Sequence, residues 1–451
     1  MENVINKRHS SNLLYCLFNH TALILMILII PFSGTELLGS NLLGISGAKP
    51  INLIGVLLFC TWILKGAEFI NFTSKIRAKA FVLFCAYLII FSLEFFRSYL
   101  NLGVLLVRNI DAFGDFGTSK FGYILSYYVR AIFTVFSFFY IINHIKNTKQ
   151  IETIANIILF SIFMFSLFTL LISFDLVISG APRSAIRESF QLTFSFHYNT
   201  VGTLIMLGIP LALSRSLSYG KGWYIVFGTI LIALLFTQSR GAILGGLAGV
   251  FAFFFFQRKI SIPMLLSIIF LGLLGYLLSD YIIPLFSRGL ESGDLSEISS
   301  GRIDSMWIPL IEELMAEPQK LLFGLGMFGM IMSDSYVTNF NFFQATHAHN
   351  AYLNLLADAG LIVLTLFLIL FYYSAKKAFK YSKKLNEPTY NALFSCAVAY
   401  AVSALTGRQW FPIVDNMLLY PVIALLVAYV ICYRKLKRDT NSGLTKEAAF
   451  T

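Results

Sequence analysis

The sequence predicts an all-α polytopic membrane protein with about twelve transmembrane helices. Of the 451 residues, 57% are hydrophobic and only 13% are charged, and long apolar stretches recur along the chain. Soluble domains carry about 25% charged residues, so this composition excludes a water-soluble fold. The aromatic residues, 16% of the chain, suit the membrane interfaces and do not require a nucleic-acid partner.

Spanning helices need about 20 mostly apolar residues. The stretches that approach this length are residues 13–31, 50–64, 80–96, 121–142, 153–174, 198–214, 223–238, 242–257, 261–285, 359–375, 389–406 and 413–433. Several are short or contain polar residues, which leaves eleven or thirteen crossings open. The first follows Lys7 and Arg8 as a signal peptide would, but no small-residue cleavage site follows it. We therefore expect it to be a retained first helix.

The distribution of Lys and Arg predicts the orientation. Loops on the side of the two termini hold about twice as many of these residues as loops on the other side, as the positive-inside rule describes for cytoplasmic loops. Both termini are therefore expected in the cytoplasm. The expected organisation is helices 1 to 9 over residues 1–285, one large outer segment over 286–358, helices 10 to 12 over 359–433, and a cytoplasmic tail over 434–451.

Arg residues on the outer side call for an explanation, because that side is poor in basic residues. A guanidinium group forks two hydrogen bonds onto phosphate or carboxylate oxygens, so a cluster would suit a phosphorylated substrate. For Arg240 the alternative is a snorkelling loop residue, and for Arg302 an ordinary loop residue. The candidates are Arg183, Arg187, Arg240, Arg288, Arg302 and Arg408.

His347 and His349 flank Ala348 just before the tenth expected span. An imidazole here could act as a general base, donate to a phosphate, ligate a metal, or serve a structural role. Spacing of two residues does not place both rings on one helix face, which disfavours metal. No metal or cofactor is expected.

Arg130 falls within the fourth expected span, where pairing with an acidic residue of another helix is the simplest interpretation. The five Cys residues all lie in or beside apolar stretches, so no disulfide framework is expected. The chain also lacks the P-loop, dinucleotide-binding, nucleophile-elbow and zinc-protease motifs.

The ordered set of these features resembles the O-antigen ligase and O-antigen polymerase superfamily of bacterial inner-membrane glycosyltransferases. Nine residues separate Asn350 from Gly360, as in the ligase motif, whose final Gly, Thr or Tyr is replaced here by Val363. The matching segments are Ser239-Arg240-Gly241, then Ser300-Gly301-Arg302 with Trp307, Pro318 and Phe323-Gly324-Leu325-Gly326, and last His349-Asn350.

The resemblance implies transfer of a glycan from undecaprenyl pyrophosphate to an acceptor hydroxyl at the periplasmic face, without metal or nucleotide sugar. It implies that Arg240 and Arg302 hold the donor pyrophosphate and that His349 is the general base or a further pyrophosphate contact. Supporting substrate contacts are assigned to Arg183, Arg187, Arg288, His347 and Asn350.

Two alternatives to the ligase stay open at this point, a polymerase and a flippase. A ligase joins the glycan to lipid A-core, whereas a polymerase extends one lipid-linked glycan with another. The ligase is favoured by the spacing to Gly360 and disfavoured by Val363. A polysaccharide flippase would also have about twelve helices, but such transporters often carry inverted repeats, and none is visible in this sequence.

Overall fold

The computed structural model describes residues 19–42, 48–64, 75–109, 120–257, 301–340, 346–407, 409–412 and 416–441. Every regular element in these ranges is helical and none is a strand, which confirms the predicted fold class.

The helices of the first half are α2 (Thr21–Ile29), α3 (Glu36–Gly39), α4 (Pro50–Leu64), α5 (Lys75–Leu100), α6 (Leu102–Arg108), α8 (Lys120–Tyr123), α9 (Arg130–His144), α10 (Thr148–Ile178), α11 (Arg183–Phe194), α12 (Tyr198–Met206) and α13 (Gly208–Tyr219). Those of the second half are α14 (Trp223–Phe236), α15 (Arg240–Gln257), α19 (Ile308–Ala316), α20 (Pro318–Phe323), α21 (Gly329–Met332), α22 (Ala351–Leu385), α23 (Pro388–Ser403) and α24 (Leu419–Asn441). A 3₁₀ turn, η1, covers Ile30–Phe32, and π-helical turns cover η5 (Ile124–Val129), η6 (Ile303–Trp307) and η7 (Tyr336–Phe340).

Seven helical stretches of the described residues are long and apolar enough to cross a membrane: Lys75–Leu100, Lys120–His144, Thr148–Ile178, Tyr198–Tyr219, Arg240–Gln257, Ala351–Leu385 and Leu419–Lys437. Each overlaps an expected span. Three more expected spans fall on shorter apolar helices, Thr21–Phe32, Pro50–Leu64 and Trp223–Phe236. The span expected at 389–406 coincides with α23, which has 16 residues, and the one at 261–285 lies outside the described residues. The chain is a multi-pass membrane protein, and its total of twelve crossings stays a prediction.

The outer surfaces of α5 and α22 account for part of the high apolar content of the chain. Large apolar side chains are exposed along both helices, including Val82 and Ile89 on α5 and Leu366 and Ile369 on α22. Such a surface is costly in water and favourable against lipid chains. These two helices therefore face the membrane.

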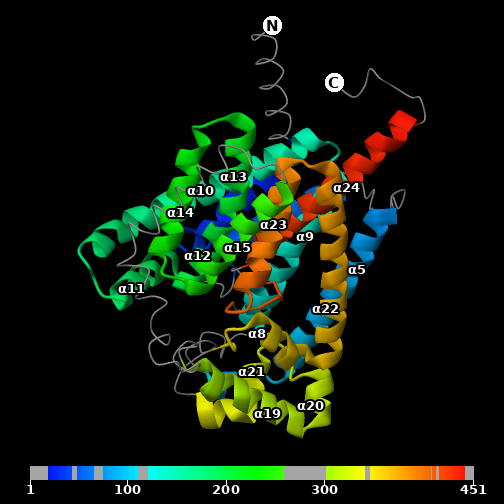
Figure 1. Ribbon diagram of the computed structural model, residues 1–451. Helices are drawn as coiled ribbons and strands as arrows, with labels where there is room; N and C mark the ends of the chain where they lie inside the picture. Colours follow the sequence, from blue (N-terminus) through cyan, green and yellow to red (C-terminus); the bar gives the residue numbers. More distant parts are fainter. Residues whose placement is uncertain are drawn as a thin grey trace.

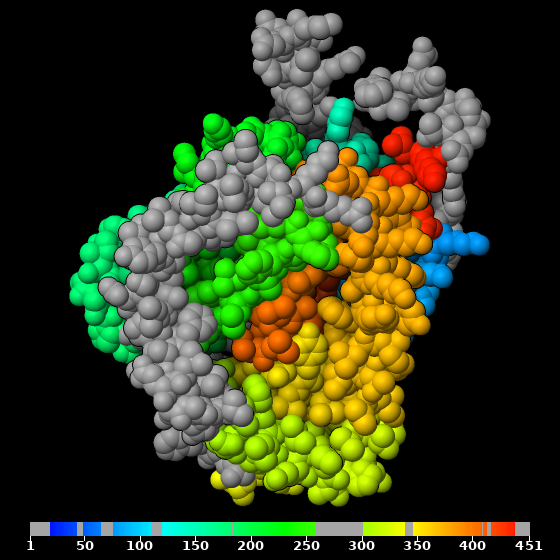
Figure 2. All heavy atoms as spheres, in the orientation of Figure 1, coloured from blue at the N-terminus to red at the C-terminus, as the bar shows by residue number. Residues whose placement is uncertain are grey.

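The segment 302–340 forms one end of the molecule. In Figure 1, α19, α20 and α21 lie together at the end opposite the C-terminal part of α24, and α22 runs between these two ends. Figure 2 shows α19 and α20, in yellow-green, covering this end below the orange surface of α22. The location of this end on the periplasmic side stays a prediction. The division of the chain into segments 1–285, 286–358, 359–433 and 434–451 also stays a prediction.

Helix α22 is interrupted at Gly360, which has a φ of 80° and a ψ of 176°. Only glycine adopts this backbone conformation without strain. A Cβ at this position would also collide with the carbonyl oxygen of Leu322 and lie 2.6 Å from the Gly324 amide nitrogen. Gly360, a glycine of the resembled motif, therefore lets the end of α20 pack directly against the α22 backbone.

We expect Gly360→Ala to lower the stability of the folded protein by about 1–3 kcal/mol from the backbone conformation alone, with a further cost from the collision. Thermal unfolding of the purified protein in detergent measures the effect. Gly103→Ala is the matched control, because a Cβ at Gly103 in α6 would meet nothing within 4 Å. Equal unfolding temperatures for the two variants would contradict this account of the break.

Small residues bring α15 and α23 into close contact. A Cβ at Gly245 would lie 2.6 Å from the Ala399 carbonyl oxygen, and one at Gly249 would lie 3.0 Å from the Ala399 Cβ. At the N-terminus of α15, a Cβ at Gly241 would collide with the Thr406 hydroxyl. This packing, typical of small residues in membrane helices, sets the start of α15 against the turn that follows α23.

Candidate active site

Three of the Arg residues selected from the sequence come together in the structure. Arg187 lies in α11, Arg240 is the first residue of α15, and Arg302 directly precedes η6. Burial lowers the pKa of Arg302 below its ordinary value; the nearby charges of Arg240 and Arg187 lower it further, while Tyr198 opposes the shift. Because guanidinium groups keep their proton at working pH, this place concentrates positive charge and favours an anionic ligand.

Tyr198 fixes the position of Arg187. The Arg187 guanidinium carbon lies 4.2 Å from the centroid of the Tyr198 ring, within the range of a cation–π interaction. Tyr198 begins α12, and the preceding His197 accepts a 3.3 Å hydrogen bond from the Asn199 amide. The start of α12 thus orients a charged side chain of α11.

Arg240 projects from a turn whose conformation is specified by its neighbours. Gln238 has a φ of 54°, in the left-handed region that is uncommon for non-glycine residues. The Ser239 hydroxyl donates a 2.8 Å hydrogen bond to the side-chain oxygen of Asn199 in α12. A Cβ at Gly202 of α12 would lie 2.9 Å from the Ser239 Cβ, so the helix backbone lies close to this turn. Arg240 therefore starts the 18-residue α15, whose N-terminal amides also favour an anion.

His349 also has a left-handed backbone, with a φ of 53°. Its ring centroid lies 4.4 Å from that of His347, whose Nδ1 is 2.9 Å from the Thr346 hydroxyl. The Ala348 amide between them donates a 2.7 Å hydrogen bond to the side-chain oxygen of Asn354. Residues in such sparsely populated conformations cluster at functional sites. The His347 ring and the hydrogen bond from the Ala348 amide to Asn354 hold His349 in this conformation.

Asn350 caps helix α22. Its side-chain oxygen accepts hydrogen bonds from the amides of Tyr352 at 3.0 Å and Leu353 at 3.1 Å. Asn, Ser and other short polar residues are the preferred N-caps, which explains why a short polar residue follows His349 in the resembled motif. The structure thus gives the Asn350 side chain a helix-capping role, and a substrate contact by this residue stays a prediction.

Two contacts connect the His349 segment to the Arg residues. The indole N–H of Trp307, the last residue of η6, donates a 2.7 Å hydrogen bond to the Ala348 carbonyl, and Arg302 directly precedes the same π-helical turn. The amide of Ala351 donates a 2.8 Å bond to the carbonyl of Ala404, in the turn that also packs against Gly241. These contacts therefore link the segments that carry Arg240, Arg302 and His349, the three residues expected to carry the chemistry.

Trp307→Phe removes the donor to Ala348 while keeping an aromatic ring. We expect the loosened His349 segment to lower transfer about fivefold, the equivalent of one hydrogen bond of about 1 kcal/mol. Steady-state transfer by the purified protein measures this, with Trp223→Phe in α14 as the matched control. A Trp307→Phe rate equal to that of the control would show that this bond does not position His349.

The other predicted site residues have separate outcomes. Arg183 begins α11, but its side chain is not described, and Arg288 and Arg408 lie outside the described residues. His347 is buried beside His349. In the described ranges, no group of three His, Cys, Asp or Glu side chains is arranged to hold a metal ion.

Arg130 does not have the acidic partner expected in a neighbouring helix, as far as the described residues extend. Its electrostatic neighbours are Tyr127, one turn earlier, and Lys49, which precedes α4. Burial lowers the pKa of Lys49 to about 8, and the Arg130 charge adds to this shift. The simplest interpretation of Arg130 from the sequence is therefore not supported by any ion pair in these ranges.

Residues 225–368 match the family model described as O-antigen ligase. The chain contains an O-antigen ligase domain. This confirms the predicted superfamily, and with it a membrane enzyme of the O-antigen ligase and polymerase family. No curated protein matches the chain.

The O-antigen ligase domain contains Arg240, Arg302, His349 and Gly360, whereas Arg187 and Tyr198 lie before it. Tyr198 was not predicted from the sequence, and Trp307 entered only as part of the resembled pattern. A clue to Tyr198 was present in its position beside His197 at the start of an apolar run. Its contact with Arg187 depends on how α11 folds back on α12, which no local pattern indicates.

Proposed function

We propose that this protein transfers a glycan from undecaprenyl pyrophosphate to an acceptor hydroxyl at the periplasmic face of the bacterial inner membrane. The observation that supports this most is that the charges of Arg240, the first residue of α15, and of Arg187 both act on Arg302. A pyrophosphate is a dianion or more, and several guanidinium groups at a helix N-terminus suit its oxygens.

The proposed reaction exchanges one C–O bond for another. The acceptor oxygen attacks the anomeric carbon of the donor glycan, and its proton passes to His349 as the general base. The bond from the anomeric carbon to the phosphate oxygen breaks, and its electron pair leaves with the lipid pyrophosphate. Arg240 and Arg302 stabilise the negative charge that develops on that oxygen, so side chains supply the electrostatic role that a metal ion has in other transferases.

Arg187 is proposed to extend the same anion site. Its guanidinium lies on the Tyr198 ring and acts electrostatically on Arg302. Contributions of Arg183, Arg288 and His347 to substrate binding, and the absence of metal and nucleotide sugar, belong to this proposal.

We propose lipid A-core as the acceptor, so that the enzyme is a ligase. The spacing from Asn350 to Gly360 supports this, because it matches the ligase motif. Polymerisation of lipid-linked glycans is the second candidate, favoured by Val363 at the position where the ligase motif has Gly, Thr or Tyr.

Deletion of the gene, followed by complementation with wild type or Arg240→Ala at matched protein levels, tests the proposal. Surface polysaccharide is then resolved on a gel. Loss of a ligase leaves lipid-linked polymer unattached, whereas loss of a polymerase leaves single repeat units on the core. A ladder left unchanged by the deletion would refute both transferase functions, whereas an unchanged ladder in the Arg240→Ala strain alone would remove Arg240 from the proposed site.

A further inference from the structure

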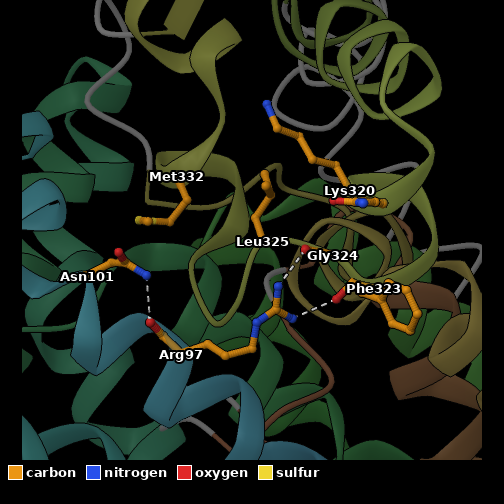
Figure 3. A pocket seen from close by; sticks show the side chains of 8 residues that line it. Arg97, Asn101, Lys320, Phe323, Gly324, Leu325 and Met332 are labelled. Atoms are coloured by element: carbon orange, nitrogen blue, oxygen red, sulfur yellow. Dashed lines mark hydrogen bonds between the residues drawn. The ribbon is translucent and has the colours of Figure 1, made fainter.

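A groove on the protein surface lies away from the Arg residues of the candidate active site. An open groove of about 590 Å³ is formed between the C-terminal end of α5 and helix α20 with the turn that follows it (Figure 3). Its lining includes Arg97, Asn101, Gln319, Lys320 and Phe323, and none of Arg187, Arg240, Arg302 or His349. The groove is therefore separate from the candidate active site.

The two cations in the groove are already matched by acceptors. Arg97 forms a 2.6 Å ion pair with Glu94 and donates hydrogen bonds to the carbonyls of Phe323 at 2.7 Å and Gly324 at 2.8 Å. Figure 3 shows the Arg97 guanidinium turned toward these two carbonyl oxygens.

Lys320 is matched in the same way. It pairs with Glu317 at 2.6 Å and with Glu313 and Asp334 at 3.2 Å each. Carboxylates thus outnumber the two lining cations in their immediate contacts. The groove therefore does not suit a phosphate, an acidic sugar or an anionic lipid headgroup, each of which would have to displace these partners.

The remaining lining suits an uncharged saccharide. Asn101 and Gln319 expose carboxamides, a group that both donates to and accepts from hydroxyl groups. The Asn101 amide donates one hydrogen bond, 2.9 Å long, to the Arg97 carbonyl, which leaves its oxygen and second hydrogen for a ligand. The Phe323 side chain lines the groove and is 58% exposed, so its ring is accessible to a ligand there. A sugar ring presents hydroxyls at its edge and C–H groups on its face, and so matches amides beside an aromatic ring.

The groove wall is attached to the helix that follows His349. The amide of Leu325 donates to the Ala357 carbonyl at 2.7 Å, and that of Gly326 to the Asp358 carbonyl at 2.9 Å. The Gly329 amide donates to the Asp358 carboxylate at 2.7 Å. The helical segment from Asn350 to Asp358 spans roughly 12 Å at 1.5 Å per residue. A glycan of a few sugar residues therefore reaches from the groove to His349.

We propose that this groove binds uncharged sugar residues of the glycan substrate, away from the bond that reacts. The inference rests on the proposed transferase function and adds a saccharide-binding site to it. Binding energy from such remote sugars positions the reacting end. Long glycans are then better substrates than single repeat units.

Transfer by the full-length protein in lipid nanodiscs tests this inference, with lipid-linked glycans isolated from the native strain and sorted by length. For Phe323→Ala and Gln319→Ala, we expect KM for long glycans to rise about tenfold through loss of a ring contact and a hydrogen bond, with kcat unchanged. KM for single repeat units is expected to stay unchanged. Met315→Ala, which removes an exposed side chain of α19 outside the groove, is the matched control.

Varying donor length with a fixed acceptor, and then the reverse, identifies which glycan occupies the groove. Titration of the released oligosaccharide, freed of its lipid, measures binding without catalysis and is expected to weaken in both variants. If both groove variants keep the wild-type KM and the wild-type oligosaccharide binding while Arg240→Ala abolishes transfer, the saccharide-binding role of the groove is overturned. The transferase proposal then stands. Absence of transfer by the wild-type protein would instead overturn the transferase proposal, and the titration alone would then decide whether the groove binds saccharide.

Discussion

Replacing Arg302 by Ala is expected to lower the rate of glycan transfer about 100- to 1000-fold, the usual cost of removing one donor to a developing oxyanion. Arg302 is the member of the cationic group that both others act on: burial lowers its pKa, and the charges of Arg240 and Arg187 lower it further. Removing it takes away positive charge where the leaving pyrophosphate is proposed to lie. The rate is measured with purified protein and isolated lipid-linked glycan.

Arg302→Lys separates charge from geometry. Lysine keeps the charge but lacks the fork of two parallel donors, so we expect part of the lost rate to return. Lys120→Ala, which removes an exposed cation at the start of α8, is the matched control and is expected to keep the wild-type rate. An Arg302→Ala rate within a factor of two of this control would remove Arg302 from the proposed site.

His349→Ala is expected to lower transfer about 100- to 10,000-fold if the imidazole is the general base. The left-handed backbone of His349 and the hydrogen bonds to Ala348 from Trp307 and Asn354 hold this residue in one place. A base must be unprotonated to accept the acceptor proton, so wild-type activity is expected to fall at acidic pH as imidazole becomes protonated. This acidic limb is expected to disappear in the residual activity of His349→Ala.

His349→Arg distinguishes the base from a pyrophosphate contact. Arginine supplies a permanent positive charge and no base, so it restores activity only if the role is electrostatic. We expect no restoration. His144→Ala, at the end of α9, is the matched control, and a large loss in that variant would point to a general effect of removing a histidine.

The position of the candidate site follows from the sequence because membrane insertion constrains charge. Arg240 and Arg302 stand out on a side that is otherwise poor in basic residues, and their proximity in the structure depends on the turns that the sequence places at helix ends. The role of Asn350 was predicted less well. Asn350 is a helix cap in the structure, a local role that its position before an apolar run already suggests.

Contacts between distant segments could not be derived from local patterns. Arg97 of α5 bonds the carbonyls of Phe323 and Gly324, and Tyr198 lies under Arg187, through tertiary packing that hydropathy does not encode. The number of membrane crossings could not be derived from the sequence for a different reason. Helices such as α4 and α14 are shorter than a full span, and composition alone does not say whether local thinning of the bilayer or neighbouring segments complete the crossing.

The most direct test of the transferase is a reconstituted reaction with purified protein in nanodiscs, isolated lipid-linked glycan and lipid A-core as acceptor. Glycan attached to the acceptor and lipid pyrophosphate released are measured in the same samples. The account predicts that wild-type protein forms the two products in equal amounts and that Arg240→Ala and Arg302→Ala form neither above background. Equal product formation by wild type and these two variants would contradict it.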